Sequence, residues 1–431
     1  MNSIKRLYLN FYLVVLALYV YFDKGIAYSF LSEVLLVAGV VLLILNYRSL
    51  EIPWNKRIFF LLVFLLVTAV FVFRGVRGYP FMEVIRDSFM FNYILFVFVL
   101  FLFKDDMDYF MEKLGVIYQW FPLVAVISFL CLSYVPYLAQ LEVFGGQLLL
   151  LYKYGDLSVH LFIVTMLLLN GYIKMGKKFM VINAVLIAYL YLIASSYSRA
   201  GMLAYIISFG VFYFFSVNRV MKKQLVSYLK YVPVILLIAL PIYLGTNVKE
   251  NFQGRKLGLD QLKENATSVF SPDAEGTLSD NKVWRLVWWG KIIDYTFGGE
   301  YFLAGKGLGM SLASDDEIPG SEDGELRSPH NFHMTVLARY GVPFFVLWLA
   351  WIFLHFKRIW QKGLDPLSLM LLVISLTFIF NASFDVYLEG PMGAFPFWTF
   401  VGLLYTHEAF GIKKDPIILT TKDKEIEKKS S

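Results

Sequence analysis

The chain has 431 residues, of which 58% are hydrophobic and 17% are charged. Soluble domains carry about 45–50% apolar and about 25% charged residues, so this composition excludes an ordinary water-soluble protein. The apolar residues form runs of about 15 to 22, the length with which a helix crosses a bilayer, which predicts an all-α polytopic membrane protein. The net charge of +6 is therefore interpreted from its distribution over the loops, and not as a sign of nucleic-acid binding. A single cysteine, Cys131, excludes an intramolecular disulfide.

Twelve apolar runs are candidates for transmembrane helices. In chain order they cover residues 7–22, 26–45, 58–73, 89–103, 114–135, 157–173, 179–194, 201–217, 228–246, 332–355, 367–380 and 392–406. The sequence therefore divides into a part with nine helices at 1–246, a large hydrophilic loop at 247–329, three further helices within 330–410, and a tail at 411–431. The tail is rich in Lys, Glu, Asp and Ser, a composition typical of disorder.

The positive charges of the loops predict the orientation of the chain. With the N-terminus in the cytoplasm, the inner loops and the tail hold about 23 Lys and Arg, whereas the short outer loops hold about six. Because Lys and Arg concentrate on the cytoplasmic side, both termini are predicted to be cytoplasmic and the loop 247–329 external. The first apolar run lacks a convincing cleavage site, so we expect it to be retained as a membrane helix.

The external loop carries two predicted helices. Residues 256–270 place leucine, alanine and valine side chains on one side, which is typical of a helix lying on the membrane surface. Residues 281–297 follow a capping Ser–Asp pair and contain three tryptophans, which favour the interface between membrane and water.

Three charged residues at the predicted outer face have the chemistry of a phosphate-handling site. Arg199 lies between two apolar runs, Arg285 lies in the tryptophan-rich helix, and His330 directly precedes the tenth run. Arginines donate paired hydrogen bonds to phosphate oxygens, and a histidine can accept a proton near neutral pH. These types suit displacement of a lipid diphosphate by a hydroxyl, although an arginine at a membrane boundary is more often an anchor or a lipid contact.

Five segments together resemble the O-antigen ligase and polymerase family of bacterial membrane glycosyltransferases. They are SRAG at 198–201, Arg285 followed by two tryptophans, GKGLG at 305–309, PHNFH and VLARYGVPFF within 329–345, and FDVYLEGPMG at 384–393. Each segment alone is common, but their order around one large external loop is specific. The resemblance covers roughly residues 198–400.

The resemblance implies transfer of a glycan from undecaprenyl diphosphate to an acceptor hydroxyl at the outer face of the bacterial inner membrane. The acceptor would be lipid A-core for a ligase or a glycan end for a polymerase. It further implies a fold like that of the C-type glycosyltransferases, no metal and no other cofactor. Arg199 and Arg285 would bind the diphosphate and His330 would be the catalytic base. The candidate supporting residues are Asn331, His333, Arg339, Asp385 and Glu389.

Other interpretations of these residues remain open from sequence alone. His330 and His333 could form a metal pair, but only three other histidines remain in the chain, so a zinc site would need Asp or Glu to complete it. The acidic stretch 315–325 is interpreted as a solvated loop, and the glycines of 305–309 as structural. The arginines at 74, 77 and 86 would either contact phosphate or pair with Glu83 and Asp87.

Two other classes of protein compete with an enzyme. A twelve-helix transporter or lipid flippase would place charged residues near mid-membrane and have two related halves, whereas here they cluster at one face. An assembly factor without chemistry would tolerate loss of each candidate residue. Membrane lipids are expected contacts in all three cases, and nucleic acid in none.

Overall fold

The computed structural model describes residues 3–150, 153–216, 226, 230–246, 257–268, 277–319, 326–361 and 364–411. These residues are almost entirely helical and include no β-strand. The α-helices are α1 (Ser3–Phe22), α2 (Leu31–Leu45), α3 (Lys56–Gly75), α4 (Phe81–Asn92), α5 (Leu95–Phe101), α6 (Met107–Tyr134), α7 (Pro136–Ala139), α8 (Tyr154–Leu169), α9 (Lys177–Tyr197), α10 (Arg199–Phe215), α12 (Val232–Gly245), α13 (Leu259–Ser268), α14 (Thr277–Phe297), α15 (Leu312–Asp315), α16 (Phe332–Phe356), α17 (Pro366–Ala382) and α18 (Pro391–Phe410). Short 3-10 helices include η1 (Asp23–Ile26) and η6 (Tyr387–Glu389). The predicted tail lies almost wholly outside the described residues.

The all-α membrane fold is confirmed. Five helical segments are long and apolar enough to cross a membrane, and a sixth candidate is the bent pair α4–α5. Five shorter apolar helices follow the same runs: α2, α8, α10, α12 and α17. Every predicted run overlaps a helix or the bent pair. The number of twelve spans and the likeness to C-type glycosyltransferases stay predictions.

Two helices, α17 and α18, form the centre of the bundle. Nearly every residue of both is buried, because α17 packs against α8, α10 and α18, while α18 also packs against α1 and α5. Helix α12 lies at the periphery and exposes most of its apolar side chains. Apolar side chains exposed on the outside of the bundle are those expected of a surface that faces lipid.

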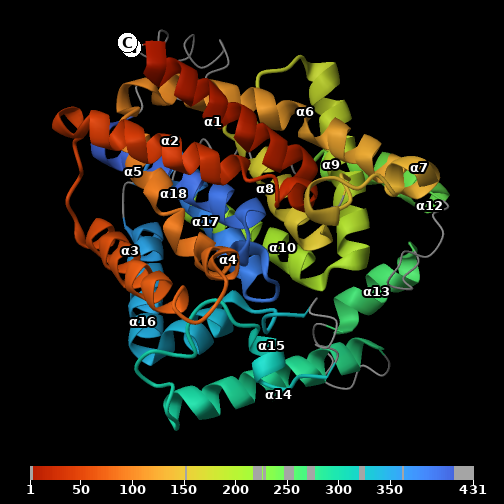
Figure 1. Cartoon of the computed structure of the whole chain (residues 1–431). Helices are drawn as coiled ribbons and strands as arrows, with labels where there is room; N and C mark the ends of the chain where they lie inside the picture. Colours follow the sequence, from red (N-terminus) through yellow and green to blue (C-terminus); the bar gives the residue numbers. More distant parts are fainter. Residues whose placement is uncertain are drawn as a thin grey trace.

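One end of the bundle carries the described part of the large loop, and we name it the loop end. Figure 1 shows α13, α14 and α15 gathered there, on the side opposite α1. Helix α14 docks on α15 and α16 through a small separate core that includes Trp288, Ile292, Leu312 and Leu337. The two helices predicted in the loop are confirmed as α13 and α14, and the rest of 247–256, 269–276 and 320–325 lies outside the described residues.

Two predicted membrane helices are interrupted. The run at 89–103 is a pair of helices bent by 47°. The run at 332–355 is broken at Gly341, which has φ 80° and ψ 178°, a backbone conformation that only glycine adopts readily. Both were predicted as single helices, and apolar length could not reveal the breaks.

The break in α16 is held by the loop. The Lys306 amide donates to the Ala338 carbonyl at 2.7 Å, taking the place of the helical amide of Val342. The Val342 amide in turn donates to the Phe302 carbonyl at 2.8 Å. A Cβ atom on Gly341 would lie 2.6 Å from that carbonyl oxygen, so only glycine permits this close approach.

Candidate active site

The SRAG segment fixes the start of α10 at the loop end. The Ser198 hydroxyl caps the helix by accepting a hydrogen bond from the Gly201 amide at 3.0 Å. A Cβ atom on Gly201 would lie only 3.0 Å from the Cα of Gly155, so glycine lets α10 pack closely against α8. Arg199, the first residue of α10, is thereby positioned at the edge of the bundle.

His330 is positioned by the turn that leads into α16. Its backbone has φ 50°, in the left-handed region that few residues other than glycine adopt. Asn331 caps α16, since its side-chain oxygen accepts hydrogen bonds from the amides of His333 and Met334 at 3.0 and 3.3 Å. The Trp289 indole of α14 donates to the Pro329 carbonyl at 2.9 Å and holds the other side of the turn.

An acid–base cluster surrounds the imidazole. One carboxylate oxygen of Asp385 lies 3.9 Å from His330 Nδ1 and 3.0 Å from Lys153 Nζ. Burial alone would raise the pKa of Asp385, but the charge of Lys153 and the neighbouring His330 hold this pKa below its ordinary value. The carboxylate is therefore ionised and faces the histidine. Asp385 follows α17 and Lys153 precedes α8, so the pair joins two segments that are far apart in the sequence.

Arg285 extends from α14 toward the same cluster. Its guanidinium donates to the Phe384 carbonyl at 3.2 Å and lies over the Trp284 ring, 5.5 Å from the centroid. The Trp284 ring also meets the His330 imidazole edge-on at 5.8 Å. Burial and the nearby positive charge of Arg199 lower the pKa of Arg285, while Asp385 opposes them. The charge of Arg199 thus acts on Arg285, so these two predicted diphosphate ligands belong to the same region of the structure.

Burial determines the protonation state of His330. It lowers the pKa of His330 to about 4, and the positive charges of Arg285 and Lys153 add to this effect against the carboxylate of Asp385. The imidazole is therefore neutral at neutral pH. A neutral imidazole offers one nitrogen lone pair that can accept a proton from a hydroxyl.

A cavity of about 510 Å³ opens beside His330. This volume lies in the range of small-molecule sites, about 300–1,000 Å³. The residues around it come from the second predicted external loop, from the segment before α16, from α16 itself and from the loop before α18. Lys153 and Glu389 also line the cavity, whereas Arg199 and Arg285 do not.

The predicted supporting residues have different roles. His333 uses both ring nitrogens inside the fold, accepting from the Trp348 indole at 3.1 Å and donating to the Ser383 hydroxyl at 3.0 Å. Glu389 accepts from the Thr335 hydroxyl at 2.6 Å at the cavity wall. Asn331 is a helix cap, as described above. Asp385 is thus the supporting residue that faces His330.

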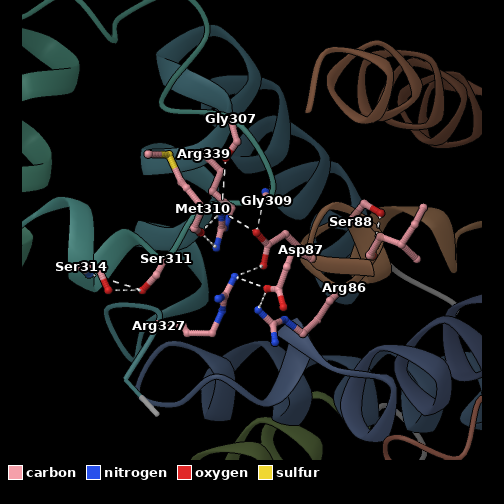
Figure 2. Close-up of polar contacts among 12 residues, drawn as sticks. Arg86, Asp87, Ser88, Gly307, Gly309, Met310, Ser311, Ser314, Arg327 and Arg339 are labelled. Carbon is pink, nitrogen blue, oxygen red and sulfur yellow. Dashed lines mark hydrogen bonds and ion pairs between the residues drawn. The ribbon is translucent and has the colours of Figure 1, made fainter. Parts of the chain in front are cut away.

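Arg339 holds the glycine-rich loop in place. Its guanidinium pairs with Asp87 at 2.8 Å and donates to the carbonyls of Gly307 and Met310, both at 3.2 Å. Asp87 also accepts from the Gly309 amide at 2.8 Å, and Figure 2 shows these contacts converging. All three glycines of GKGLG have positive φ angles, in agreement with their structural interpretation.

The acidic stretch 315–325 is only partly described, and Asp316 departs from the solvated loop that was predicted. Asp316 is buried, accepting a hydrogen bond from the Trp288 indole at 2.6 Å and pairing with Lys306 at 2.5 Å. Among the described residues, no group of three or more His, Cys, Asp or Glu is arranged to hold a metal ion. The acidic stretch therefore contributes a structural anchor through Asp316.

Sequence reasoning missed the contributions of Lys153 and Arg327. Lys153 was counted only as a charge of a short outer loop, and Arg327 only as a charge of the large loop. The available signal was that each is a cation at the predicted outer face, near a polar segment. Their partners, Asp385 and Glu83, are more than 200 residues away in the sequence, so no local sequence pattern predicts these pairs.

Comparison with known proteins identifies the segment that carries this site. Residues 184–349 match the family described as O-antigen ligase, a region that includes Arg199, Arg285 and His330 but ends before Asp385. No curated protein matches the chain. The match confirms the resemblance drawn from the five motifs, and ligase-type glycosyl transfer in a membrane is the activity it supports. Residues 184–349 are thus similar to the O-antigen ligase family.

Proposed function

We propose that the protein transfers a glycan from undecaprenyl diphosphate to an acceptor sugar hydroxyl at the outer face of the bacterial inner membrane. Arg199 and Arg285 bind the diphosphate, and His330 is the general base. The observation that carries the proposal is the cluster of Arg285, His330 and Asp385 beside a cavity at the loop end. The orientation of the chain follows from the charge bias of its loops.

The reaction is a displacement at the anomeric carbon of the donor sugar. The acceptor oxygen forms a bond to this carbon while the bond to the diphosphate oxygen breaks, and the diphosphate leaves with the electron pair. The proton of the acceptor hydroxyl passes to His330. Guanidinium groups stabilise the negative charge that develops on the leaving oxygen. The activated diphosphate sugar supplies the free energy, so the reaction requires no nucleotide.

The charges around His330 affect both its protonation during transfer and the later loss of that proton. The ionised carboxylate of Asp385, 3.9 Å from Nδ1, stabilises the imidazolium that forms during transfer. Arg285 and Lys153 disfavour that imidazolium when the site is empty. A bound diphosphate neutralises Arg285, which raises the basicity of His330 only when the donor is present. The leaving diphosphate is also the final acceptor of the proton.

The proposal includes both acceptor classes of the family. A ligase would use lipid A-core as the acceptor, and a polymerase would use the end of a growing glycan. The matched family is described as O-antigen ligase, which favours the ligase. Metal-independent transfer is consistent with a site built from arginines and a histidine, whose charges replace those of a cation.

Complementation of a deletion strain tests the proposal. The variants His330→Ala, Arg199→Ala and Arg285→Ala are expected to lose surface glycan at normal protein levels. Removal of a general base costs about 10²–10⁴-fold in rate, and removal of a donor that stabilises the developing charge costs about 10²–10³-fold. Arg77→Ala is the matched control, since Arg77 is an exposed arginine in the second predicted external loop, stacked on Phe73. This control is expected to retain normal glycan.

The gel pattern of the deletion strain separates the two acceptors. Bare core with accumulated lipid-linked polymer indicates loss of a ligase, and core bearing one repeat indicates loss of a polymerase. Normal glycan from all three site variants would overturn the enzyme and favour a transporter or assembly factor.

A further inference from the structure

A group of three arginines forms the cavity wall around Asp87. Arg86, Arg327 and Arg339 share two carboxylates, Glu83 and Asp87 (Figure 2). Arg327 lies 2.8 Å from Glu83 and 3.7 Å from Asp87, and Arg86 pairs with the same Glu83 oxygen. The three cations therefore exceed their shared anions by one charge.

The three arginines differ in what they can still bind. Only 3% of the Arg339 side chain is exposed, and its donors are used by Asp87 and by backbone carbonyls. Arg86 and Arg327 expose 29% and 26% of their side chains and both line the cavity. Each guanidinium has five N–H groups, and among the described residues the ion pairs of Arg86 and of Arg327 involve one nitrogen each. Both retain donors for a ligand.

The described lining of the cavity carries an excess of positive charge. Its described lining includes five cationic side chains and two carboxylates: Lys24, Arg86, Lys153, Arg327, Arg339, Asp87 and Glu389. Burial lowers the pKa of Arg327, and the positive charges of Arg86 and Arg339 act in the same direction against Asp87 and Glu83. Desolvated guanidinium groups that repel one another are stabilised when an anion with several oxygens binds between them.

We propose that this cavity binds an anionic group of the acceptor, namely a phosphate or carboxylate on a sugar close to the attacking hydroxyl. The proposal rests on the function proposed above, because it places the acceptor on the cavity side of His330. The attacking hydroxyl must reach His330, and His330 lines the cavity. Arg199 and Arg285 do not line it, so the donor diphosphate and the acceptor anion occupy separate arginine sites.

Equilibrium binding to the purified full-length protein in lipid nanodiscs tests the separation of the two sites. The probes are glucose 6-phosphate and glucuronate for the acceptor site, glucose as the neutral control, and inorganic pyrophosphate for the donor site. Wild-type protein is expected to bind either anionic sugar at least about tenfold more tightly than glucose, since a charge-assisted hydrogen bond contributes about 1.5–3 kcal/mol.

Four variants distinguish binding at this wall from binding at the donor site. Arg86→Gln and Arg327→Gln are each expected to weaken binding of glucose 6-phosphate about tenfold while leaving pyrophosphate binding unchanged. Arg285→Ala is expected to have the opposite pattern. Glu83→Gln removes the carboxylate that the two arginines share, so it is expected to tighten glucose 6-phosphate binding several-fold. A gain of affinity cannot result from misfolding.

Several outcomes would overturn the proposal. Equal binding of glucose and glucose 6-phosphate would exclude an anion site, and loss of pyrophosphate binding in Arg86→Gln would assign these arginines to the donor. An unchanged or weakened affinity in Glu83→Gln would contradict the role given to Arg86 and Arg327. If Arg285→Ala alone retained pyrophosphate binding while the Arg86 variants behaved as expected, the proposed function would fail and the anion site would stand.

Discussion

At neutral pH His330 is uncharged and can accept a proton, because its pKa of about 4 lies well below the ordinary value near 6.5. The same low pKa makes the imidazole a weaker base. In the proposed reaction, the positive charges around the imidazole disfavour its protonated form until the diphosphate binds. The proposed site must bind an anion and also remove a proton. The side chains that perform these two tasks affect one another's protonation.

The pH dependence of transfer follows from this arrangement. In the wild type, kcat/KM is expected to stay constant from about pH 8 down to about pH 5.5 and to fall only as His330 becomes protonated near pH 4. Asp385→Asn removes the carboxylate that raises the pKa of His330, so the fall should move to still lower pH. The measurement is kcat/KM against pH for both proteins. A fall centred near pH 6.5 in the wild type would contradict the burial of the imidazole.

Lys153 is expected to act as a positioning residue through Asp385. Lys153→Met removes the ammonium 3.0 Å from the carboxylate, so Asp385 should lose its fixed orientation toward His330. We expect kcat to fall about tenfold or more with little change in the donor KM, and Lys153→Arg to recover most of the activity. Equal losses in the methionine and arginine variants would indicate a purely steric role.

The sequence predicted the types and faces of these residues but not all their pairings. Arg199, Arg285 and His330 are recognisable because each lies in a motif at one predicted face. Lys153 has no such motif, and its partner Asp385 is 232 residues away. Arg339, a candidate supporting residue, pairs with Asp87, which is 252 positions earlier in the chain. The pairs depend on how distant helices pack, which a single sequence does not specify.

At the scale of the helix, the break in α16 is the feature that apolar periodicity could not predict. The segment is apolar enough overall to be read as one membrane helix, although Pro343 follows Gly341 by two residues and disfavours a continuous helix. The loop supplies backbone hydrogen bonds that a continuous helix would make within itself: the Lys306 amide donates to the Ala338 carbonyl, and the Phe302 carbonyl accepts from the Val342 amide. Gly341 is the one residue there that can adopt the required backbone angles.

Gly341→Ala is expected to destabilise the protein by about 1–3 kcal/mol from backbone strain, and further through the clash with the Phe302 carbonyl. The thermal midpoint in detergent should fall, and transfer activity with it. Gly210→Ala, in α10, is the matched control, since a Cβ there meets nothing within 4 Å. This control should leave the midpoint unchanged or raise it slightly, because alanine favours helix. Equal midpoints for the two variants would refute the strained break.

At the scale of the whole molecule, the charge bias of the loops and the position of the site agree. The loop end carries α13, α14 and the candidate site, and the sequence predicts that this end is external. Helix α1, whose start is predicted to be cytoplasmic, lies on the opposite side. Composition and charge were sufficient to predict the membrane class and an orientation. The bent and short helices explain why length alone supports fewer spans than the twelve predicted.

Cysteine labelling tests the orientation. In a Cys131→Ser background, Lys263→Cys in α13 should react with a membrane-impermeant maleimide in intact spheroplasts. Ser49→Cys, in an inner loop, should react only after the membrane is permeabilised. Both positions are exposed in the structure. Labelling of the second variant in intact spheroplasts would reverse the predicted orientation.

The contact between Lys306 and the broken turn of α16 also constrains how such proteins diversify. A loop that supplies hydrogen bonds to a membrane helix cannot be exchanged as an independent module, because the recipient helix must carry the matching glycine and the donor loop the matching amides. Chimeras that move only one half should assemble poorly, whereas chimeras that move 300–345 as a block keep both. New specificity is therefore easier to acquire in the side chains lining the cavity than by replacement of the loop.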